Sequence, residues 1–206
     1  MIEIIDNYAS EDLYGQLLET SLAYSKVHWI GIQAEPENAL HDLVHEVYNS
    51  NVEQEGISGA TAWYNIRPKN PKMHNDIDSY STQKGISYRP EVLPERTFLY
   101  YLKSPESGGQ LAIHTRVSFV RAGQAGQDII WDDSEVDTIS AIVNRLISMP
   151  ADVAHRVLPY TGNRVSIGMI FWVDLPKIYP EADPDNNTVY DRIWEIEDSE
   201  QIALYV

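Results

Sequence analysis

The sequence contains no cysteine, which excludes disulfide frameworks, thiolate metal sites and cysteine nucleophiles. Positive charge is also scarce: 15 lysines and arginines stand against 31 aspartates and glutamates, which gives a net charge of −16 at pH 7. Nucleic acids and anionic membranes both require a positive protein face, so neither is expected to be the main partner. These counts leave the oligomeric state open.

Long hydrophobic runs are missing as well. The longest largely apolar stretch, residues 165–173, is far shorter than the roughly 20 residues that span a bilayer. The first six residues, MIEIID, lack the basic segment and apolar stretch of a signal peptide. The 206 residues suffice for one sizeable domain, and we expect a soluble, cytoplasmic, globular protein.

The first 56 residues carry the spacing of amphipathic helices, and we expect this zone to be helical. Ser10 precedes the first predicted helix as a capping residue, and a second helix is predicted over 37–48. His41 and His45 lie four residues apart on that second helix, a spacing that suits a metal ion. The HExxH pattern is absent, so both histidines are expected to face solvent. The periodic apolar positions are Leu13, Leu17, Leu18, Leu22 and Ala23, then Leu40, Leu43, Val44 and Val47.

From about residue 60 to 176 the pattern changes to short β-like runs separated by glycine, proline and asparagine. No helical segments alternate with these runs, which favours a sandwich, barrel or jelly roll over a parallel sheet. Between them, the polar segment 77–95 has the length of a lid or binding loop. An acidic extension follows, and its last part, 189–206, is expected to pack back as an edge element. The predicted strands are 61–67, 97–102, 110–120, 153–160 and 164–173.

One histidine is followed two residues later by a carboxylate: His74 precedes Asp76. In an extended segment these two side chains project to the same side and can converge on one ion. Asp78 lies four residues from His74 and lacks this spacing. His155, on a distant predicted strand, would complete a set of two histidines and one carboxylate, which is typical of non-haem Fe(II) oxygenases.

Arg164 follows His155 by nine residues. The intervening segment 159–163 is interpreted as a hairpin turn, which would place the two residues on neighbouring antiparallel strands. In the strand after it, Ser166 and Gly168 share the face of Arg164 and leave a cavity with a cation at its end, a site suited to a ligand carboxylate. Each residue alone also has an ordinary explanation, as a half-buried strand histidine or a surface-paired arginine. The opposite face is apolar throughout, with Val165, Ile167, Met169 and Phe171.

In this order and spacing, the residues resemble the prolyl 4-hydroxylase-like branch of the 2-oxoglutarate- and Fe(II)-dependent oxygenases, most closely its short bacterial and phage members. That family has HxD, a distant histidine, and an arginine or lysine about nine residues later. The segments 97–102 and 108–111 resemble its "YLN … GGeL" strand pair, and 143–150 resembles the strand that leads to the distal histidine.

The resemblance covers about residues 60–176 and implies a mainly β fold with flanking helices. The expected core is a double-stranded β-helix (jelly roll) packed by N-terminal α-helices. The expected organisation is one oxygenase domain over 1–206, with helical support in 1–56, the core in 60–176 and a C-terminal extension in 177–206.

The resemblance also implies roles for individual side chains. A tyrosine hydroxyl is expected to assist the arginine, and because adjacent strand residues face opposite ways, only one of Tyr100 and Tyr101 can do so. The family alignment favours Tyr101. The implied set is His74, Asp76 and His155 for Fe(II), with Arg164, Tyr101, Tyr64 and Ser166 for 2-oxoglutarate.

The implied reaction is hydroxylation of an unactivated C–H bond with O2 through an Fe(IV)-oxo species. It decarboxylates 2-oxoglutarate to succinate and CO2, with ascorbate as a supporting reductant. A prolyl residue of a protein or peptide is the first expectation for the substrate, and the acidic composition suits a basic target. Two alternatives stay open: a hydroxylase of a free amino acid or other small molecule, and a non-catalytic jelly-roll binding module.

Overall fold

The computed structural model describes residues 1–20, 27–53, 55–65, 76, 96–118, 136–151, 153–173 and 187–190, with the side chains of 115–118 and 187–190 excepted. Two described helices, α1 (Glu11–Thr20) and α2 (Ala39–Asn51), accompany antiparallel sheets. Neither of these helices has the length and apolar character needed to cross a membrane.

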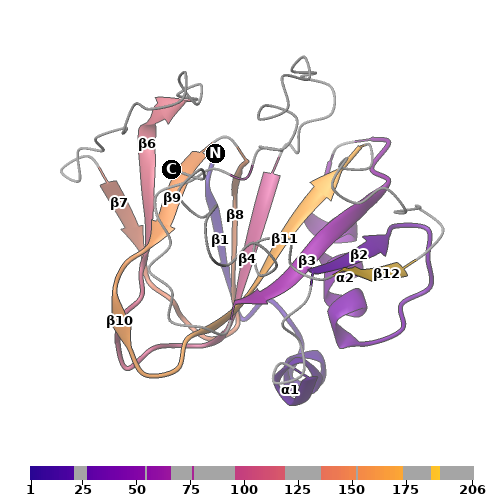
Figure 1. Cartoon of the computed structure of the whole chain (residues 1–206), viewed down its shortest axis with the longest axis horizontal. Helices are drawn as coiled ribbons and strands as arrows, with labels where there is room; N and C mark the ends of the chain where they lie inside the picture. The colour runs from indigo at the N-terminus through magenta and orange to yellow at the C-terminus, as the bar shows by residue number, and fades with distance from the viewer. Residues whose placement is uncertain are drawn as a thin grey trace, which may run out of the picture.

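The described strands form three sheets, shown in Figure 1. The major sheet has seven strands in the order β1 (Glu3–Asp6), β8 (Arg145–Pro150), β4 (Arg96–Lys103), β11 (Val165–Trp172), β3 (Gly59–Asn65), β2 (Val27–Gly31) and β12 (Asn187–Tyr190). The minor sheet has the order β7 (Val136–Ile139), β6 (Leu111–Ser118) and β9 (Val153–Val157). A two-stranded ribbon joins β10 (Tyr160–Thr161) to β5 (Ser107–Gly108).

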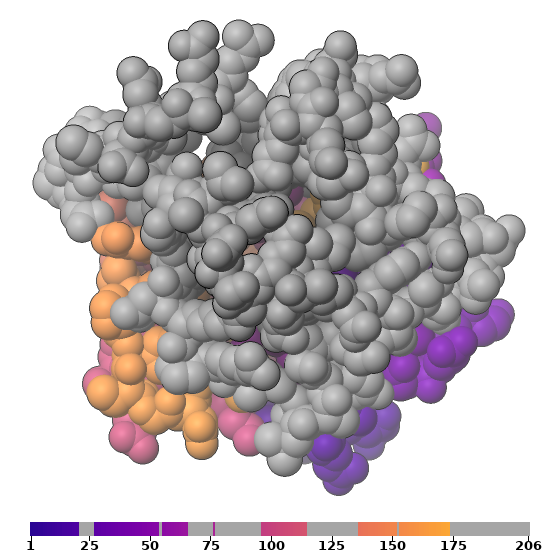
Figure 2. All heavy atoms as spheres, in the orientation of Figure 1, coloured from indigo at the N-terminus to yellow at the C-terminus, as the bar shows by residue number. Residues whose placement is uncertain are grey.

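One face of the major sheet, which we call the helix face, packs against α1 and α2. Alternate residues of β11 point to it, as the sequence pattern predicts: Val165, Ile167, Met169 and Phe171 are all buried in this core. From the helices, Leu17 and Leu43 contribute fully buried side chains to it. In the space-filling view, the β9–β10 segment and the residues around α2 occupy opposite sides of the molecule (Figure 2).

The opposite face of the major sheet, which we call the inner face, packs against the minor sheet over part of its area. Leu99 and Tyr101 of β4 meet Leu111 and Ile113 of β6 in a second core. Further along the same face, a third cluster gathers around Trp29 and Trp172. Two antiparallel sheets that face each other, with helices outside the larger one, confirm the jelly-roll prediction.

Two sequence expectations for the first 56 residues are wrong. The zone is not purely helical, because β1 and β2 interrupt it: β1 pairs with β8, and β2 joins β3 to β12. His41 is 3% exposed rather than solvent-facing, and His45 is half-buried. The helical spacing placed His41 correctly on α2. The periodicity alone did not reveal that β2 would cover this side of the helix. There, the His28 ring meets the His41 ring edge-on, with 6.4 Å between the ring centroids.

The predicted hairpin between His155 and Arg164 is also wrong. His155 lies on β9, which pairs with β6 in the minor sheet, whereas Arg164 directly precedes β11 in the major sheet. The chain crosses from one sheet to the other through β10, which pairs with β5 (Figure 1). The two residues therefore approach the space between the sheets from opposite layers. The predicted loop 77–95 lies outside the described residues.

Candidate functional site

Arg164 directly precedes β11 and is 4% exposed. Its Nη2 donates to the Tyr101 hydroxyl at 3.3 Å, and its Nη1 donates to Ser166 Oγ at 3.1 Å. Its Nε donates to the Gly109 carbonyl oxygen at 3.3 Å. The guanidinium carbon lies 5.0 Å from the centre of the Tyr101 ring. Three neutral oxygens therefore hold the cation in one orientation.

The charge of Arg164 has no carboxylate partner among the described residues. A buried cation with only neutral partners is costly, because the lost hydration is not replaced by an opposite charge. Three of the five guanidinium N–H groups donate to these oxygens, so two remain without an acceptor among the described residues. The Tyr101 and Ser166 hydroxyls accept from Arg164 and keep their own hydrogens as donors. The N–H and O–H donors that this cluster retains suit a carboxylate.

The alternation of β4 separates its two central tyrosines onto opposite faces. Tyr101 points to the inner face, where burial raises the pKa of its hydroxyl even though Arg164 opposes this shift. Tyr100 points to the helix face and donates to Asn144 Oδ1 at 2.8 Å. Of the two tyrosines, the structure thus brings Tyr101 to Arg164, with its hydroxyl kept protonated as a donor.

Gly109 allows the β5–β6 connection to pass close to Arg164. Its φ is +70°, a region that favours glycine. A Cβ atom at this position would lie 2.7 Å from Pro105 Cγ and 3.3 Å from Arg164 Cδ. The absence of a side chain therefore lets the Gly109 carbonyl reach the guanidinium.

Asp76 and His155 form the second polar group. Asp76 Oδ2 lies 3.4 Å from His155 Nε2, with the two side chains 10% and 9% exposed. The Asp76 backbone N–H donates to the Ala151 carbonyl at 3.1 Å, which ties residue 76 to the connection between β8 and β9. His155 Nδ1 lies 3.0 Å from the Val153 carbonyl. Two segments about 80 residues apart in sequence thus meet here.

The chemistry of this pair fits a bound cation. With Nδ1–H donated to the Val153 carbonyl, Nε2 turns a lone pair toward the Asp76 carboxylate. Such a bond to a backbone carbonyl is the usual partner of a metal-binding histidine. Nitrogen and oxygen ligands at about 2.1 Å from a shared ion lie about 3.0 to 3.4 Å apart at ordinary coordination angles, which matches the observed separation. His74 and Asp78 lie outside the described residues, and no metal-binding group of three side chains forms within them.

A shared apolar wall connects the Arg164 cluster to the Asp76–His155 pair. Ile113 on β6 lies directly opposite His155 on β9, so both side chains project to the same side of the minor sheet. Ile113 also packs in the core that contains Tyr101, the partner of Arg164. The two polar groups are therefore set on facing layers of one interior.

Tyr64 is not part of this arrangement. It lies opposite Ile167 in the β3–β11 pair and is buried in the helix-face core. Its hydroxyl lies 3.4 Å from Thr20 Oγ1 of α1. The expectation that Tyr64 contributes to the cofactor pocket does not agree with this position, because strand alternation turns it away. Its neighbours Trp63 and Asn65 take the inner face instead.

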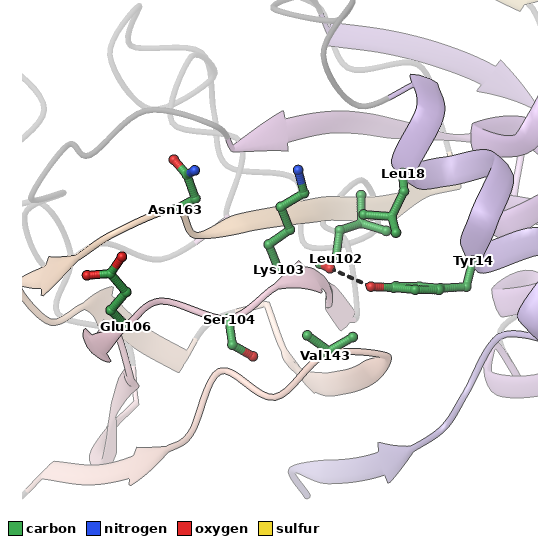
Figure 3. A pocket seen from close by; sticks show the side chains of 8 residues that line it. All are labelled: Tyr14, Leu18, Leu102, Lys103, Ser104, Glu106, Val143 and Asn163. Atoms are coloured by element: carbon green, nitrogen blue, oxygen red, sulfur yellow. Dashed lines mark hydrogen bonds between the residues drawn. The ribbon is translucent and has the colours of Figure 1, made fainter.

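A shallow hollow near the end of β4 lies apart from these residues. Figure 3 shows Tyr14 donating to the Leu102 carbonyl, a bond of 3.0 Å, below the side chains of Lys103 and Asn163. None of the predicted site residues lines this hollow, so we assign no function to it. Its lining is Tyr14, Leu18, Leu102, Lys103, Ser104, Glu106, Val143 and Asn163.

Sequence reasoning missed the backbone groups that orient the site. The carbonyls of Gly109, Ala151 and Val153 hold Arg164, residue 76 and His155 respectively. Only the Gly-Gly pair at 108–109 gave a signal in the sequence. The other two carbonyls belong to residues without any distinctive pattern.

The fold is similar to the folds of several prolyl hydroxylases of known structure. A Pseudomonas putida prolyl 4-hydroxylase matches with a TM-score of 0.54 and 15% identity, covering 83% of this chain and 86% of that chain. A viral collagen prolyl hydroxylase from Paramecium Bursaria Chlorella virus-1 matches with a TM-score of 0.54 and 14% identity, covering 83% and 89%. A Trichoplax adhaerens prolyl hydroxylase, solved with a hypoxia inducible factor peptide fragment, matches with a TM-score of 0.51 and 17% identity, covering 83% of each chain.

No protein-family model matches the chain, and no curated protein sequence matches it. The identities to the solved structures are low, so the likeness concerns the fold. At that level, it agrees with the jelly-roll fold that the sequence resemblance implied.

Proposed function

We propose that this protein is a 2-oxoglutarate- and Fe(II)-dependent hydroxylase that acts on a prolyl residue of a protein or peptide. The observation that carries the proposal is the meeting of Asp76 and His155 across 3.4 Å, within the interior that also holds Arg164. The pair offers metal ligands, and Arg164 offers a carboxylate clamp. A family that uses both features has this fold.

In this proposal, His74, Asp76 and His155 hold the iron. When bound, Fe(II) supplies, with 2-oxoglutarate and O2, the oxidising power to hydroxylate an unactivated C–H bond, leaving succinate and CO2. The Val153 carbonyl keeps the proton of His155 on Nδ1, so Nε2 stays available as a ligand. The bond from residue 76 to Ala151 fixes the carboxylate beside it.

Arg164 binds the far carboxylate of 2-oxoglutarate in a two-pronged contact. Tyr101 and Ser166 orient the guanidinium and turn their own O–H groups toward the same ligand. Leu111 and Ile113, both buried, exclude water from this end of the pocket, which strengthens the charged hydrogen bonds. The cosubstrate thereby supplies the negative charge that Arg164 lacks.

The substrate class rests on two supports. A structurally similar hydroxylase was solved with a peptide fragment bound, which favours a peptide for this chain too. The net charge of −16 favours a basic peptide, since opposite charges speed encounter and suppress wrong partners. We therefore propose a lysine- or arginine-rich segment that contains proline.

The test is incubation of the purified protein with Fe(II), ascorbate, 2-oxoglutarate and a set of peptides. The set pairs basic proline-containing peptides with the same peptides lacking proline, and adds free proline. Succinate is measured together with the mass of each peptide. We expect succinate and a gain of one oxygen on the proline-containing basic peptides, and neither with the Asp76→Ala variant.

The alternatives give different outcomes in the same assay. Oxygen gained by free proline and not by peptides would favour a small-molecule hydroxylase. An absence of succinate beyond the Asp76→Ala background, in every mixture, would favour a non-catalytic binding module and overturn the proposal.

A further inference from the structure

Asn65, the last residue of β3, stands on the same face as the Arg164 cluster. It lies directly opposite Ser166 in the β3–β11 pair, and Ser166 in turn lies opposite Tyr101 in the β4–β11 pair. Side chains opposed in this way share one face, with Cβ atoms about 5 Å apart. Tyr101, Ser166 and Asn65 therefore form one row across three strands of the inner face.

The Asn65 amide differs from the other two side chains of this row in its hydrogen bonding. The side chain is half-buried, and within the described part of the chain its amide makes no hydrogen bond. By contrast, Tyr101 and Ser166 both contact Arg164. Among the described residues, a half-buried amide without a partner lies beside a buried cation without a counterion, and this arrangement points to a ligand that both groups contact.

Trp63 packs against the β11 backbone on the same face as Asn65. A Cβ atom at Gly168 would lie 2.5 Å from Trp63 Cζ2 and 2.7 Å from Trp63 Cε2, so the indole rests directly on the β11 backbone. Trp63 is the cross-strand partner of Gly168, as Asn65 is of Ser166. This contact packs the inner face of the β3–β11 pair next to the Asn65–Ser166 position.

We propose that Asn65 is a further ligand-binding residue of this pocket, and that its side-chain N–H donates to the carboxylate held by Arg164. The inference rests on the proposed function, because it takes a dicarboxylate as the ligand. Ser166 contacts the carboxylate from the centre of the row, and Asn65 contacts it from the side opposite Tyr101. An amide suits this position, since a carboxylate at residue 65 would repel the ligand.

The test is calorimetric binding of 2-oxoglutarate and of glutarate to the metal-free protein and its variants. Glutarate has both carboxylates and lacks the keto group, so it reports on the carboxylate clamp without any metal. Asn65→Asp removes the donor and adds a like charge, and we expect both ligands to bind at least about 30-fold more weakly. Asn65→Ala removes one hydrogen bond to a charged group, and we expect about a tenfold loss.

Asn51→Asp is the matched control. It makes the same chemical change at the end of α2 and keeps the acceptor that Tyr8 uses at 2.9 Å. We expect its ligand affinity to equal that of the unmodified protein. Circular dichroism of each variant checks that the fold is intact.

The outcomes separate this inference from the proposed function. If the unmodified protein binds 2-oxoglutarate and Asn65→Asp binds it equally well, Asn65 is not in the pocket and the inference is overturned. If the unmodified protein binds neither dicarboxylate and forms no succinate when Fe(II) is supplied, the proposed function itself fails. A 30-fold loss in Asn65→Asp with none in Asn51→Asp supports both.

Discussion

The two faces of the major sheet are built by the same strands and differ in how they use polar groups. On the helix face, the hydroxyls of two tyrosines bind protein atoms: Tyr100 donates to Asn144, and Tyr14 donates to the Leu102 carbonyl. On the inner face, the Arg164 cluster keeps donors that no described protein group accepts. The first arrangement stabilises the fold, and the second leaves hydrogen-bonding capacity for a ligand.

Because side chains alternate along a strand, one strand can stabilise the fold with one face and bind a ligand with the other. In β11, Ile167 fills the helix-face core while Ser166 faces the candidate pocket. A substitution therefore has a different expected signature on each face. On the helix face it lowers the free energy of unfolding, and on the inner face it lowers ligand affinity.

The largest effect is expected from His155→Ala. Removing the imidazole leaves Asp76 without its neighbour at 3.4 Å and deletes a proposed ligand. We expect loss of Co(II) binding, measured by absorption titration, and loss of succinate formation. His45→Ala, which removes a half-buried histidine of α2, is the control and should retain both. Near-normal succinate production by His155→Ala would refute the ligand assignment.

The next effect is expected from Arg164→Met, which keeps an apolar stem and removes the charge. We expect 2-oxoglutarate to bind about 100-fold more weakly or worse, because its far carboxylate loses a charged partner in a buried site. Metal binding should persist. The free energy of unfolding without ligand should stay level or rise, since an uncompensated buried cation is removed. A large loss of stability with unchanged affinity would show that Arg164 is structural.

Ile167→Ala tests the helix face, three residues after Arg164 in the chain. Ile167 is fully buried, so its truncation should lower the free energy of unfolding by about 2 to 5 kcal/mol. Urea denaturation measures this change. The affinity of the remaining folded protein for 2-oxoglutarate should not change, and a tenfold loss would contradict the separation of the two faces.

The tyrosine pair of β4 gives a finer comparison. Tyr101→Phe should weaken 2-oxoglutarate binding by about 1 kcal/mol, or roughly fivefold, because one hydrogen bond is lost. Tyr100→Phe should leave affinity unchanged and lower the free energy of unfolding by about 1 kcal/mol through its lost bond to Asn144. Tyr64→Phe, also on the helix face, should leave affinity unchanged. Calorimetry and urea denaturation distinguish the three variants.

The smallest effect is a pH dependence of stability that comes from the helix face. Burial is the main cause of the lowered pKa of His41, and repulsion from His45 lowers the pKa further. The negative charges of Glu37 and Asp42 oppose this shift. The Glu37 N–H points to His41 Nδ1 at 3.2 Å, and the Asn38 side-chain nitrogen lies 3.2 Å from Nε2, so the ring is surrounded by donors that disfavour the imidazolium.

The sign follows from proton uptake. As the pH falls below about 6.5, the unfolded chain binds a proton at His41 before the folded chain does, so stability falls with pH until the folded-state pKa is passed. His41→Gln should give a shallower decline of Tm between about pH 7.5 and 5. His28 on β2 lies beside this ring and is present in both proteins. An identical decline in the variant would exclude His41 as the source.

Sequence patterns predicted much of this arrangement, in particular what depends on strand alternation. The opposite directions of Tyr100 and Tyr101, and the apolar face of β11, follow from a period of two residues. The errors concerned which strands pair with each other and in which register. The 159–163 turn looked like a hairpin because short turn-rich segments usually join paired strands, yet here the chain changes sheets at β10. Tyr64 was expected in the pocket from the family resemblance, but its actual face depends on its register with Ile167.

From the sequence alone follow the alternation of residues, the location of the acidic and apolar segments, and the set of side chains that are candidates for metal binding and for a carboxylate clamp. Those properties are local, since they depend on residue type and on spacing within one element. Three facts follow from the three-dimensional arrangement instead: His155 meets Asp76 from the minor sheet, Arg164 is buried without a carboxylate partner among the described residues, and Asn65 lies beside Ser166. Those facts depend on sheet pairing and register, which arise from contacts between segments far apart in the chain.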